Sequence, residues 1–367
     1  MPNRVLILTT GKGGGHRSSS DAIKSAILEL DPLIAVRDVD AMECFPGYGG
    51  DEQGYIALTS RYRLIWKLFF EISSAFSGIS NAVLAKPIYK KFSRLVSDYR
   101  PDVILSVHPC FVGSVSICLK RMRLSIPLHT CVIDLGRPSR LWYDKACAVT
   151  YVPTDQIFTL LLKAGFEPGR VVHSGFPIGQ RFNSAPRDHA REIGTPNVLM
   201  VNPTLKGNDT ALKMIMETLA RGVNLTVVTG SDVKLRQFLD EKRIDSANLT
   251  ILDYVRDMEA RLSNADVIIT KAGPNMILEA VRMGVPVLVT GHILGQEEGN
   301  GQYIAEGGYG LCCESPEQLG AALDRLFADD YALLKQLSAN EGGCADTAGA
   351  MVVANHVVEA LGEPVVG

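Results

Sequence analysis

The stretch Thr270–Ala280, TKAGPNMILEA, together with the tract Gly291–Asn300, GHILGQEEGN, decides the fold of the second half of this chain. It predicts a buried strand, a glycine turn and a helix that begins with proline. Pro274 suits the first helical position because its missing N–H would have no intrahelical partner there. The other N–H groups of that first turn and the helix dipole form a site for a phosphate group.

Polar side chains around this helix start suit the remaining parts of a nucleotide sugar. Glu279 lies one helical turn inside the helix, and its carboxylate can accept hydrogen bonds from both hydroxyls of a ribose. Gln296, Glu297 and Asn300 supply donors and acceptors suited to a hexose. Phosphate, ribose and sugar contacts within one short stretch predict a site for a nucleotide-sugar donor, held by Gly273, Pro274, Asn275 and these four side chains.

The composition fits a two-domain α/β protein. At 367 residues the chain is too long for one ordinary core, and 46% hydrophobic residues with 34 glycines suit alternating strands and helices with tight turns. The net charge of −3 gives no general attraction to nucleic acid, so no nucleic-acid partner is expected. We expect a first domain over residues 1–180, a second domain with the donor site over 196–345, and a helix within 346–367 that packs back on the first domain; the family resemblance described below implies that the first domain binds the acceptor.

Strand-like runs alternate with helical patterns in both halves, which predicts two parallel sheets. A helix is expected from Ser18 or Ser19 to Leu30, a linker from Gly175 to Pro196, and a last helix over Met351–Leu361. The expected strands are Val5–Thr9, Ala35–Asp38, Val103–Val107, Leu128–Ile133, Val149–Val152, Arg170–His173, Val198–Asn202, Asn224–Thr229, Leu249–Leu252, Val267–Thr270 and Val285–Thr290.

A glycine-rich loop follows the first strand, with Gly13, Gly14 and Gly15 letting the backbone approach a ligand. The loop nearly fits the dinucleotide fingerprint and the P-loop, and both patterns fail at His16. An imidazole at this position suits proton removal from an attacking hydroxyl. The alternative interpretation is a polar residue that caps the following helix, and the sequence leaves both open.

At this point a family resemblance emerges. The segments that carry it are Val5–Thr9 with GGGHRSSSDAIKSA, Ser106–Pro109 (SVHP), Ile133–Leu135 (IDL), Gly175–Ile178 (GFPI), KAGPNMILEA and GQEEGN. In these motifs and their order the chain closely resembles the monogalactosyldiacylglycerol synthases, and it is similar to bacterial processive diacylglycerol glucosyltransferases. The resemblance implies a GT-B glycosyltransferase, with two Rossmann-like domains whose parallel sheets face a central cleft.

The resemblance also implies roles. His16 is the candidate catalytic base of an inverting transfer, and the helix start at Gly273–Asn275 with Glu279, Gln296 and Glu297 holds a UDP-sugar. Tyr254 and Val255 are placed where the uracil edge would meet backbone groups. Two loops depart from the family pattern, Val201–Asn208 after the first strand of the second domain and Arg137–Arg140 in the first. The identity of the acceptor and the number of sugars transferred therefore do not carry over.

Other polar residues have two interpretations each. His108 and Asp134 follow strand ends, where they suit a catalytic site or a structural hydrogen bond. Asp38 and Asp40 form the DxD pattern of a metal-binding transferase but lie far in sequence from the donor motifs. Lys206 or Lys271, together with the helix dipole, can neutralise the charge of a diphosphate leaving group. The alternative interpretation of Lys271 is a solvated or salt-bridged residue at the strand end. We therefore expect no metal and no cofactor beyond the UDP-sugar substrate.

The segment 55–100 interleaves aromatic and basic residues. Such amphipathic helices bind the surface of an anionic membrane, but core-packed helices with solvated basic faces have the same composition. The chain enters its first strand at once and has no apolar run of about 18 residues, so we expect a cytoplasmic protein, peripheral on the inner face of a membrane.

The sequence thus predicts an inverting transferase that moves a hexose from a UDP-sugar to a lipophilic acceptor, most simply diacylglycerol. A transferase for a soluble aglycone such as a secondary metabolite is the alternative within the class. A nucleotide-sugar epimerase on the same fold is the alternative from another class.

Overall fold

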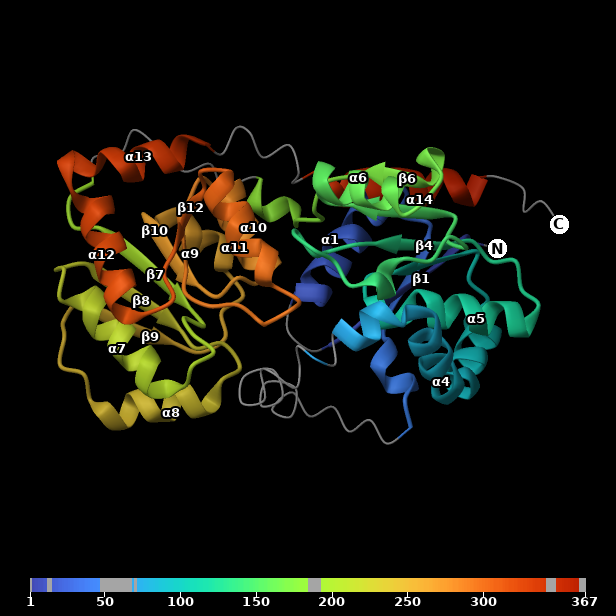
Figure 1. Ribbon diagram of the computed structural model, residues 1–367, viewed down its shortest axis with the longest axis horizontal. Coiled ribbons are helices and arrows are strands. Elements are labelled where there is room, and N and C mark those ends of the chain that lie inside the picture. The colour runs from blue at the N-terminus through green and yellow to red at the C-terminus, as the bar shows by residue number, and fades with distance from the viewer. Residues whose placement is uncertain are drawn as a thin grey trace. The chain divides into compact units, whose positions relative to one another are not determined.

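The computed structural model describes residues 2–11, 15–46, 68, 71–183, 193–340 and 348–362. The chain forms two compact units. The first contains Met1–Gly179, Leu294–Gln296 and Ala345–Gly367, and the second contains Gln180–Ile293 and Glu297–Cys344. Figure 1 shows both units, with the chain coloured from its N-terminus to its C-terminus.

The first unit is built on a six-stranded parallel sheet in the order β2-β1-β3-β4-β5-β6. β1 and β3 are apolar runs because both faces of the sheet are covered there, and Val5 to Leu8 of β1 are fully buried. The strands are β1 (Arg4–Thr9), β2 (Ala35–Asp40), β3 (Val103–Ser106), β4 (Leu128–Cys131), β5 (Val149–Val152) and β6 (Val171–His173).

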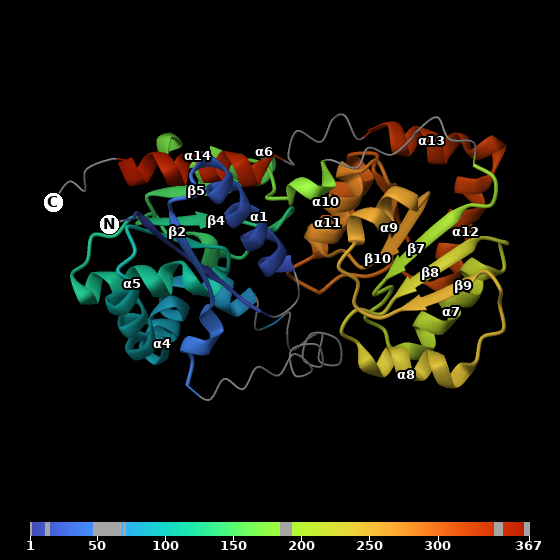
Figure 2. The same ribbon diagram turned by 180° about the vertical axis from the view of Figure 1, so that it is seen from behind.

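Helices cover both faces of this sheet (Figures 1 and 2). On one face lie α4 (Ser77–Tyr99) and α5 (Gly113–Met122), and on the other lie α1 (Gly15–Leu30), α6 (Asp155–Lys163) and α14 (Gly349–Gly362). The last of these helices returns from the far end of the sequence and packs along α1. Segments at the two ends of the described chain therefore share one layer.

The second unit also has a six-stranded parallel sheet, in the order β12-β11-β10-β7-β8-β9. Read from β9, the strand order is that of the Rossmann fold, in which the first and fourth strands lie side by side at the centre. The strands are β7 (Asn197–Val201), β8 (Asn224–Val228), β9 (Leu249–Leu252), β10 (Val267–Thr270), β11 (Val287–Val289) and β12 (Gly310–Cys312). The helices are α7 (Asn208–Leu219), α8 (Val233–Lys242), α9 (Met258–Asn264), α10 (Pro274–Arg282), α11 (Glu298–Glu306), α12 (Pro316–Phe327) and α13 (Ala332–Ala339).

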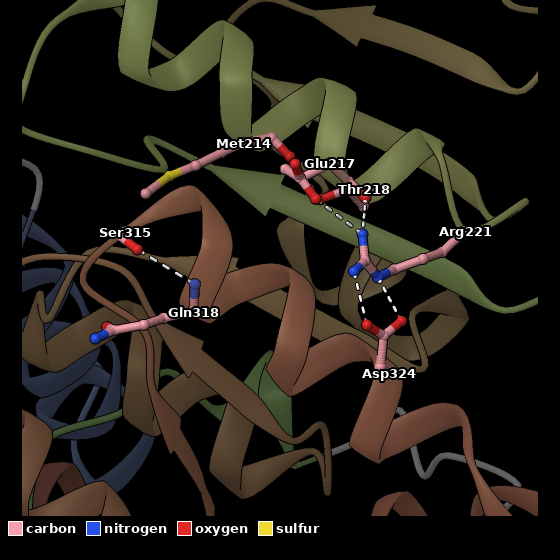
Figure 3. Close-up of polar contacts among 7 residues, drawn as sticks. All are labelled: Met214, Glu217, Thr218, Arg221, Ser315, Gln318 and Asp324. Atoms are coloured by element: carbon pink, nitrogen blue, oxygen red, sulfur yellow. Dashed lines mark hydrogen bonds and ion pairs between the residues drawn. The ribbon is translucent and has the colours of Figure 1, made fainter.

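The joint between α7 and α12 combines an apolar core with a polar clamp. Met214 and Leu323 are fully buried in it. Just beyond α7, Arg221 donates from Nε and Nη2 to the two carboxylate oxygens of Asp324, both at 2.8 Å (Figure 3). At the start of α12 the hydroxyl of Ser315 accepts the backbone N–H of Gln318 at 3.2 Å, which caps the helix.

The expected start of the first helix was wrong. We expected α1 to begin at Ser18 or Ser19 with a hydroxyl cap, but it begins at Gly15. Ser19 and Ser20 lie inside the helix at 0% and 1% exposure, so they pack against the interior and do not cap a terminus. This correction places His16 within the first helical turn.

Candidate active site

In the first unit, the candidate residues lie where the strand order reverses. β1 sits between β2 and β3, so the connections that follow β1 and β3 leave the sheet in opposite directions. Ligands of open α/β sheets bind in the crevice outside the carboxyl ends of such strands. His16, which follows β1, and His108, which follows β3, meet here with ring centroids 4.6 Å apart.

His16 is held as a neutral base with one defined tautomer. Its Nδ1 lies 2.7 Å from the backbone carbonyl oxygen of Val107. A carbonyl oxygen only accepts, so Nδ1 carries the proton and the neutral ring keeps its lone pair on Nε2. Burial lowers the pKa of His16 to about 4, against the smaller opposing effect of the Val107 hydrogen bond. The imidazole is therefore unprotonated at neutral pH.

His108 has the opposite tautomer. Its Nδ1 accepts the backbone N–H of Cys110 at 3.2 Å and caps the short helix Pro109–Phe111. Its Nε2 therefore bears the proton in the neutral ring. Burial, followed by repulsion from His16, holds the pKa of His108 well below its usual value. His108 thus has a structural role, the cap, while it also lies against the candidate base.

Asp134 follows β4 and is 7% exposed. Its Oδ2 accepts the indole N–H of Trp142 at 2.7 Å. The group seen to orient His16 is the Val107 carbonyl, while Asp134 takes part in a buried contact with Trp142. Gly13 and Gly14 of the predicted acceptor loop lie outside the described residues, and Gly15 is the first residue of α1.

In the second unit, the donor motif also lies at the reversal of the strand order, between β7 and β10. Gly273 is the N-cap of α10, Pro274 is its first residue and Asn275 follows, buried at 7% exposure. Gly273 has no side chain, so the N-cap position leaves the first-turn N–H groups uncovered. This arrangement suits an anion.

The other predicted donor residues have varied environments. Glu279 is 5% exposed within α10, and a carboxylate that deep is stable only when it is hydrogen-bonded. Tyr254 is 73% exposed in the turn after β9, with Val255 beside it. The ammonium of Lys206 donates to the carbonyl of Glu314, which follows β12.

Two side chains of the tract after β11, those of Glu297 and Asn300, are hydrogen-bonded to the loop after β10. Glu297 accepts the ammonium of Lys271 on Oε1 at 2.8 Å and the backbone N–H of Ile293 on Oε2 at 2.8 Å. Asn300 donates from Nδ2 to the carbonyl of Ala272 at 2.8 Å. The Oδ1 of Asn300 has no hydrogen-bond partner among the described residues, although the side chain is 1% exposed. A buried amide oxygen in that state is available to a ligand.

Gln296 is grouped with the first unit and Glu297 with the second. Gln296 and Glu297 are neighbours in the GQEEGN tract, but they belong to different units.

The DxD pattern is occupied by protein contacts. Asp38 pairs with Lys24, and Asp40 accepts the backbone N–H of Met42. Within the part of the chain that the structure describes, no group of three or more His, Cys, Asp or Glu residues is placed to hold a metal ion.

The functional groups that the sequence interpretation missed are mostly backbone atoms. The Val107 carbonyl orients His16, and the Ile293 N–H holds Glu297. Backbone groups carry no residue-type signal, so only the expectation that loops gather at strand ends could have pointed to them.

The two units, each with a six-stranded parallel sheet, define a protein of the GT-B fold class. Solved structures agree on the fold. UGT71G1 of Medicago truncatula, solved with UDP-glucose, superposes with a TM-score of 0.63 at 12% identity, covering 98% of each chain. MurG of Acinetobacter baumannii superposes at 0.61 and 15% identity, covering 98% of this chain and 100% of its own.

The family comparisons are more specific. Residues 16–178 match the family described as monogalactosyldiacylglycerol (MGDG) synthase, and residues 200–349 match the glycosyltransferase family 28 C-terminal domain. The chain is 29% identical to the chloroplastic monogalactosyldiacylglycerol synthase of Spinacia oleracea, over 92% of this chain and 69% of the relative. It is 27% identical to synthase 1 of Arabidopsis thaliana, over 92% and 67%. The predicted resemblance is confirmed, and the chain is a hexosyltransferase.

Proposed function

We propose that this hexosyltransferase moves a hexose from a UDP-sugar to a hydroxyl of a lipid, most simply diacylglycerol, with inversion at the anomeric carbon. The similarity to monogalactosyldiacylglycerol synthases supports the lipid acceptor. Solved structures of the same fold that hold UDP-glucose or UDP support the donor.

The observation that carries the proposal is the state of His16. Because the Val107 carbonyl accepts a hydrogen bond from Nδ1–H, the lone pair of the neutral ring lies on Nε2, which is left as a base beside the carboxyl ends of β1 and β3. In the proposed reaction Nε2 accepts the proton of the acceptor hydroxyl, whose oxygen bonds to the anomeric carbon while the bond to the diphosphate breaks. The electron pair of that bond leaves with UDP, so the charges balance without a further reactant.

The second unit is proposed to hold the donor. The first-turn N–H groups of α10 and its dipole stabilise the charge that develops on the departing diphosphate. Glu279 is proposed to take the ribose hydroxyls, and the turn at Tyr254 and Val255 the uracil. With a helix N-terminus and a lysine present, we propose that no divalent metal is needed, so activity should persist in EDTA.

A membrane-facing surface on the first unit would deliver the lipid. Part of the segment expected to contact a membrane, residues 55–67, 69 and 70, lies outside the described residues. In the remainder, Ile72, Phe76, Ile79 and Val83 are 51%, 59%, 66% and 65% exposed. Their spacing of four, three and four residues is that of one helical face. Among the described residues, no helix is long and apolar enough to cross a bilayer. We propose a peripheral protein on the cytoplasmic face.

Incubation of the full chain with UDP-glucose, UDP-galactose, UDP-glucuronate and UDP-N-acetylglucosamine tests the proposal. Each donor is offered with diacylglycerol, ceramide and small aglycones, and products are read by mass spectrometry. A glycosylated lipid that appears only with one UDP-sugar is the expected result. His16→Ala should lower kcat by about 10²-fold or more while UDP affinity stays unchanged, because a general base contributes about that much.

His173→Ala is the matched control, since His173 pairs with Asp155 in the same unit and should leave kcat unchanged. Near-normal turnover by His16→Ala would remove the base assignment. The fold alone does not separate transferases from epimerases, because a putative UDP-N-acetylglucosamine 2-epimerase of Listeria monocytogenes superposes at a TM-score of 0.63 and 15% identity, covering 98% of this chain and 95% of its own. Conversion of a UDP-sugar without any acceptor would identify an epimerase, and products only on small aglycones would identify the soluble-acceptor alternative.

A further inference from the structure

Glu297 is a buried carboxylate whose two oxygens both have partners inside the protein. The residue is 4% exposed. Oε1 accepts from the ammonium of Lys271, and Oε2 accepts from the backbone N–H of Ile293, each at 2.8 Å. A side chain in this state fixes the loop after β11 to the loop after β10. It has little surface left for a sugar.

Lys271 is the more accessible member of the pair, with a side chain 27% exposed against 5% for Glu297. Its Nζ lies 3.5 Å from the point where a β-carbon on Gly273 would stand, so the ammonium lies beside the N-cap of α10. An ammonium has three N–H donors, and among the described residues one of them goes to Glu297. The others are left for an anion at the same helix end.

We propose that Glu297 is a positioning residue that holds the Lys271 ammonium beside the N-terminus of α10, where Lys271 contacts the diphosphate of the donor. This inference rests on the proposed UDP-sugar site and assigns the cation that completes it. Glu297 then serves the donor through Lys271, and the sugar is left to other residues of the tract.

The direction in which Glu297→Gln changes UDP affinity separates a positioning role from a purely electrostatic one. Glu297→Gln removes a negative charge from the neighbourhood of a bound anion, so a purely electrostatic role predicts tighter UDP binding. A positioning role predicts weaker binding. In glutamine one of the two carboxylate oxygens is replaced by an NH2 donor, so the side chain no longer presents an acceptor to both Lys271 and the N–H of Ile293 in this geometry, and the ammonium loses its charged anchor.

Calorimetry with uridine, UDP and UDP-hexose on the full chain tests this proposal. Lys271→Met should weaken UDP by about tenfold or more, on the scale of a charge-assisted hydrogen bond, and should leave uridine unchanged. Glu297→Gln should weaken UDP and UDP-hexose by the same factor. The double variant Lys271→Met/Glu297→Gln should lose no more than Lys271→Met alone, because both changes act on one interaction.

Two control variants separate a loss of UDP binding from a loss of folding. Lys271→Met leaves a buried carboxylate without its cation, which destabilises proteins, whereas the double variant removes both charges and should unfold close to the wild-type temperature. Lys335→Met is the matched control, since Lys335 also pairs with a carboxylate in the second unit, that of Asp330, and should not alter UDP affinity.

The outcomes separate this inference from the proposed function. If the wild type does not bind UDP, the donor assignment itself is wrong. If it binds UDP and the folded double variant binds equally well, the role of Lys271 is overturned while the proposed function stands. Tighter UDP binding by Glu297→Gln, or a loss confined to UDP-hexose, would overturn the positioning role of Glu297.

Discussion

Two neighbouring imidazoles are held in opposite tautomers by backbone groups. The Nδ1–H of His16 donates a hydrogen bond to a backbone carbonyl oxygen, whereas the Nδ1 of His108 accepts one from a backbone N–H. Burial lowers the pKa of both rings, and repulsion from His16 lowers the pKa of His108 further. A general base held in this way stays unprotonated well below neutral pH, although its low basicity weakens its pull on a proton.

The pH dependence of catalysis follows from this arrangement. The active form of His16 is neutral, so kcat/KM should fall only as pH drops through the folded pKa of about 4. The unfolded chain binds the proton near pH 6.5, so the stability of the fold should also decline between about pH 6.5 and 4. We expect activity at pH 5.5 close to that at pH 7, measured with circular dichroism at each pH to exclude unfolding. An acid limb near pH 6.5 in a folded enzyme would contradict the assignment.

Asn202 explains how one departure from the family pattern is accommodated. It follows β7 directly and has a φ of 43°, in the left-handed region that favours glycine. Asparagine is among the few other residues that adopt this conformation readily. The loop Val201–Asn208 therefore keeps a turn that glycine would also make, and it does so with a side chain exposed beside the reversal of the strand order. This backbone conformation has no signal in the residue pattern, so the sequence showed only that the loop differs.

At the scale of elements, the sequence pattern predicted a strand at each position from β1 to β11, including the three-residue strands β6 and β11, and among the described strands it missed β12. The apolar runs at β7 and β10 located the centre of the second sheet, and the run at β1 located a buried strand of the first, because buried parallel strands are apolar on both faces. The edge strand β12 was missed because Gly310–Cys312 is only three residues long and begins with a glycine, which gives no strand pattern. A β-carbon on Gly310 would lie 1.9 Å from the carbonyl oxygen of Val287, so this glycine permits close strand pairing where its pattern indicates a turn.

The candidate site was also predictable only in part. Side chains that follow strand ends, such as His16 and Lys271, were singled out from their position in the pattern. Their partners were not, since Val107 and Ile293 contribute a carbonyl and an N–H. Long-range pairings such as Lys271 with Glu297 depend on two loops meeting, which needs the three-dimensional order of the strands.

The apolar face on α4 and the turn before it provides a test of membrane binding. The double variant Ile79→Ser/Val83→Ser should lower binding to phosphatidylglycerol vesicles by about tenfold, because it removes two side chains that would insert into the membrane surface. Binding of the wild type should also be weaker to zwitterionic vesicles, since Lys86, Lys90 and Lys91 lie on the same helix.

Co-sedimentation with vesicles measures both effects. Leu33→Ser is the matched control, because Leu33 is an isolated apolar side chain of the same unit at 80% exposure. Equal losses from Leu33→Ser and from the α4 variant would show that the face has no special role.

At the scale of the whole molecule, α14 shares a layer with the helix that carries the proposed base, His16. α14 packs along this helix, α1. The ring of His356 on α14 also meets Tyr151 of β5 edge-on at 5.7 Å, and Tyr151 is hydrogen-bonded to His129 of β4 at 2.9 Å. The position of α1 therefore depends on residues more than three hundred positions away in sequence.

The first residue of α14 sets how closely this helix can approach. Gly349 donates its N–H to the carbonyl of Phe176 at 3.2 Å, and a β-carbon on it would lie 2.2 Å from the carbonyl oxygen of Gly175. Both neighbours are backbone atoms and cannot rotate away, so Gly349→Ala must push α14 outward. We expect a loss of about 1–3 kcal/mol in the free energy of unfolding, as for other overpacked contacts. Hydrogen exchange should become faster in α1, and kcat should fall as His16 loses its fixed position.

Gly362→Ala provides the comparison within the same helix, because a β-carbon there meets nothing within 4 Å. Alanine in place of glycine favours a helix by up to about 1 kcal/mol, so propensity alone would make both variants slightly more stable. A close fit against Gly175 predicts opposite signs for the two, with Gly349→Ala destabilising and Gly362→Ala neutral or stabilising in urea unfolding. Equal effects would mean that α14 rests loosely on the first unit, and α1 would then owe its position to the sheet alone.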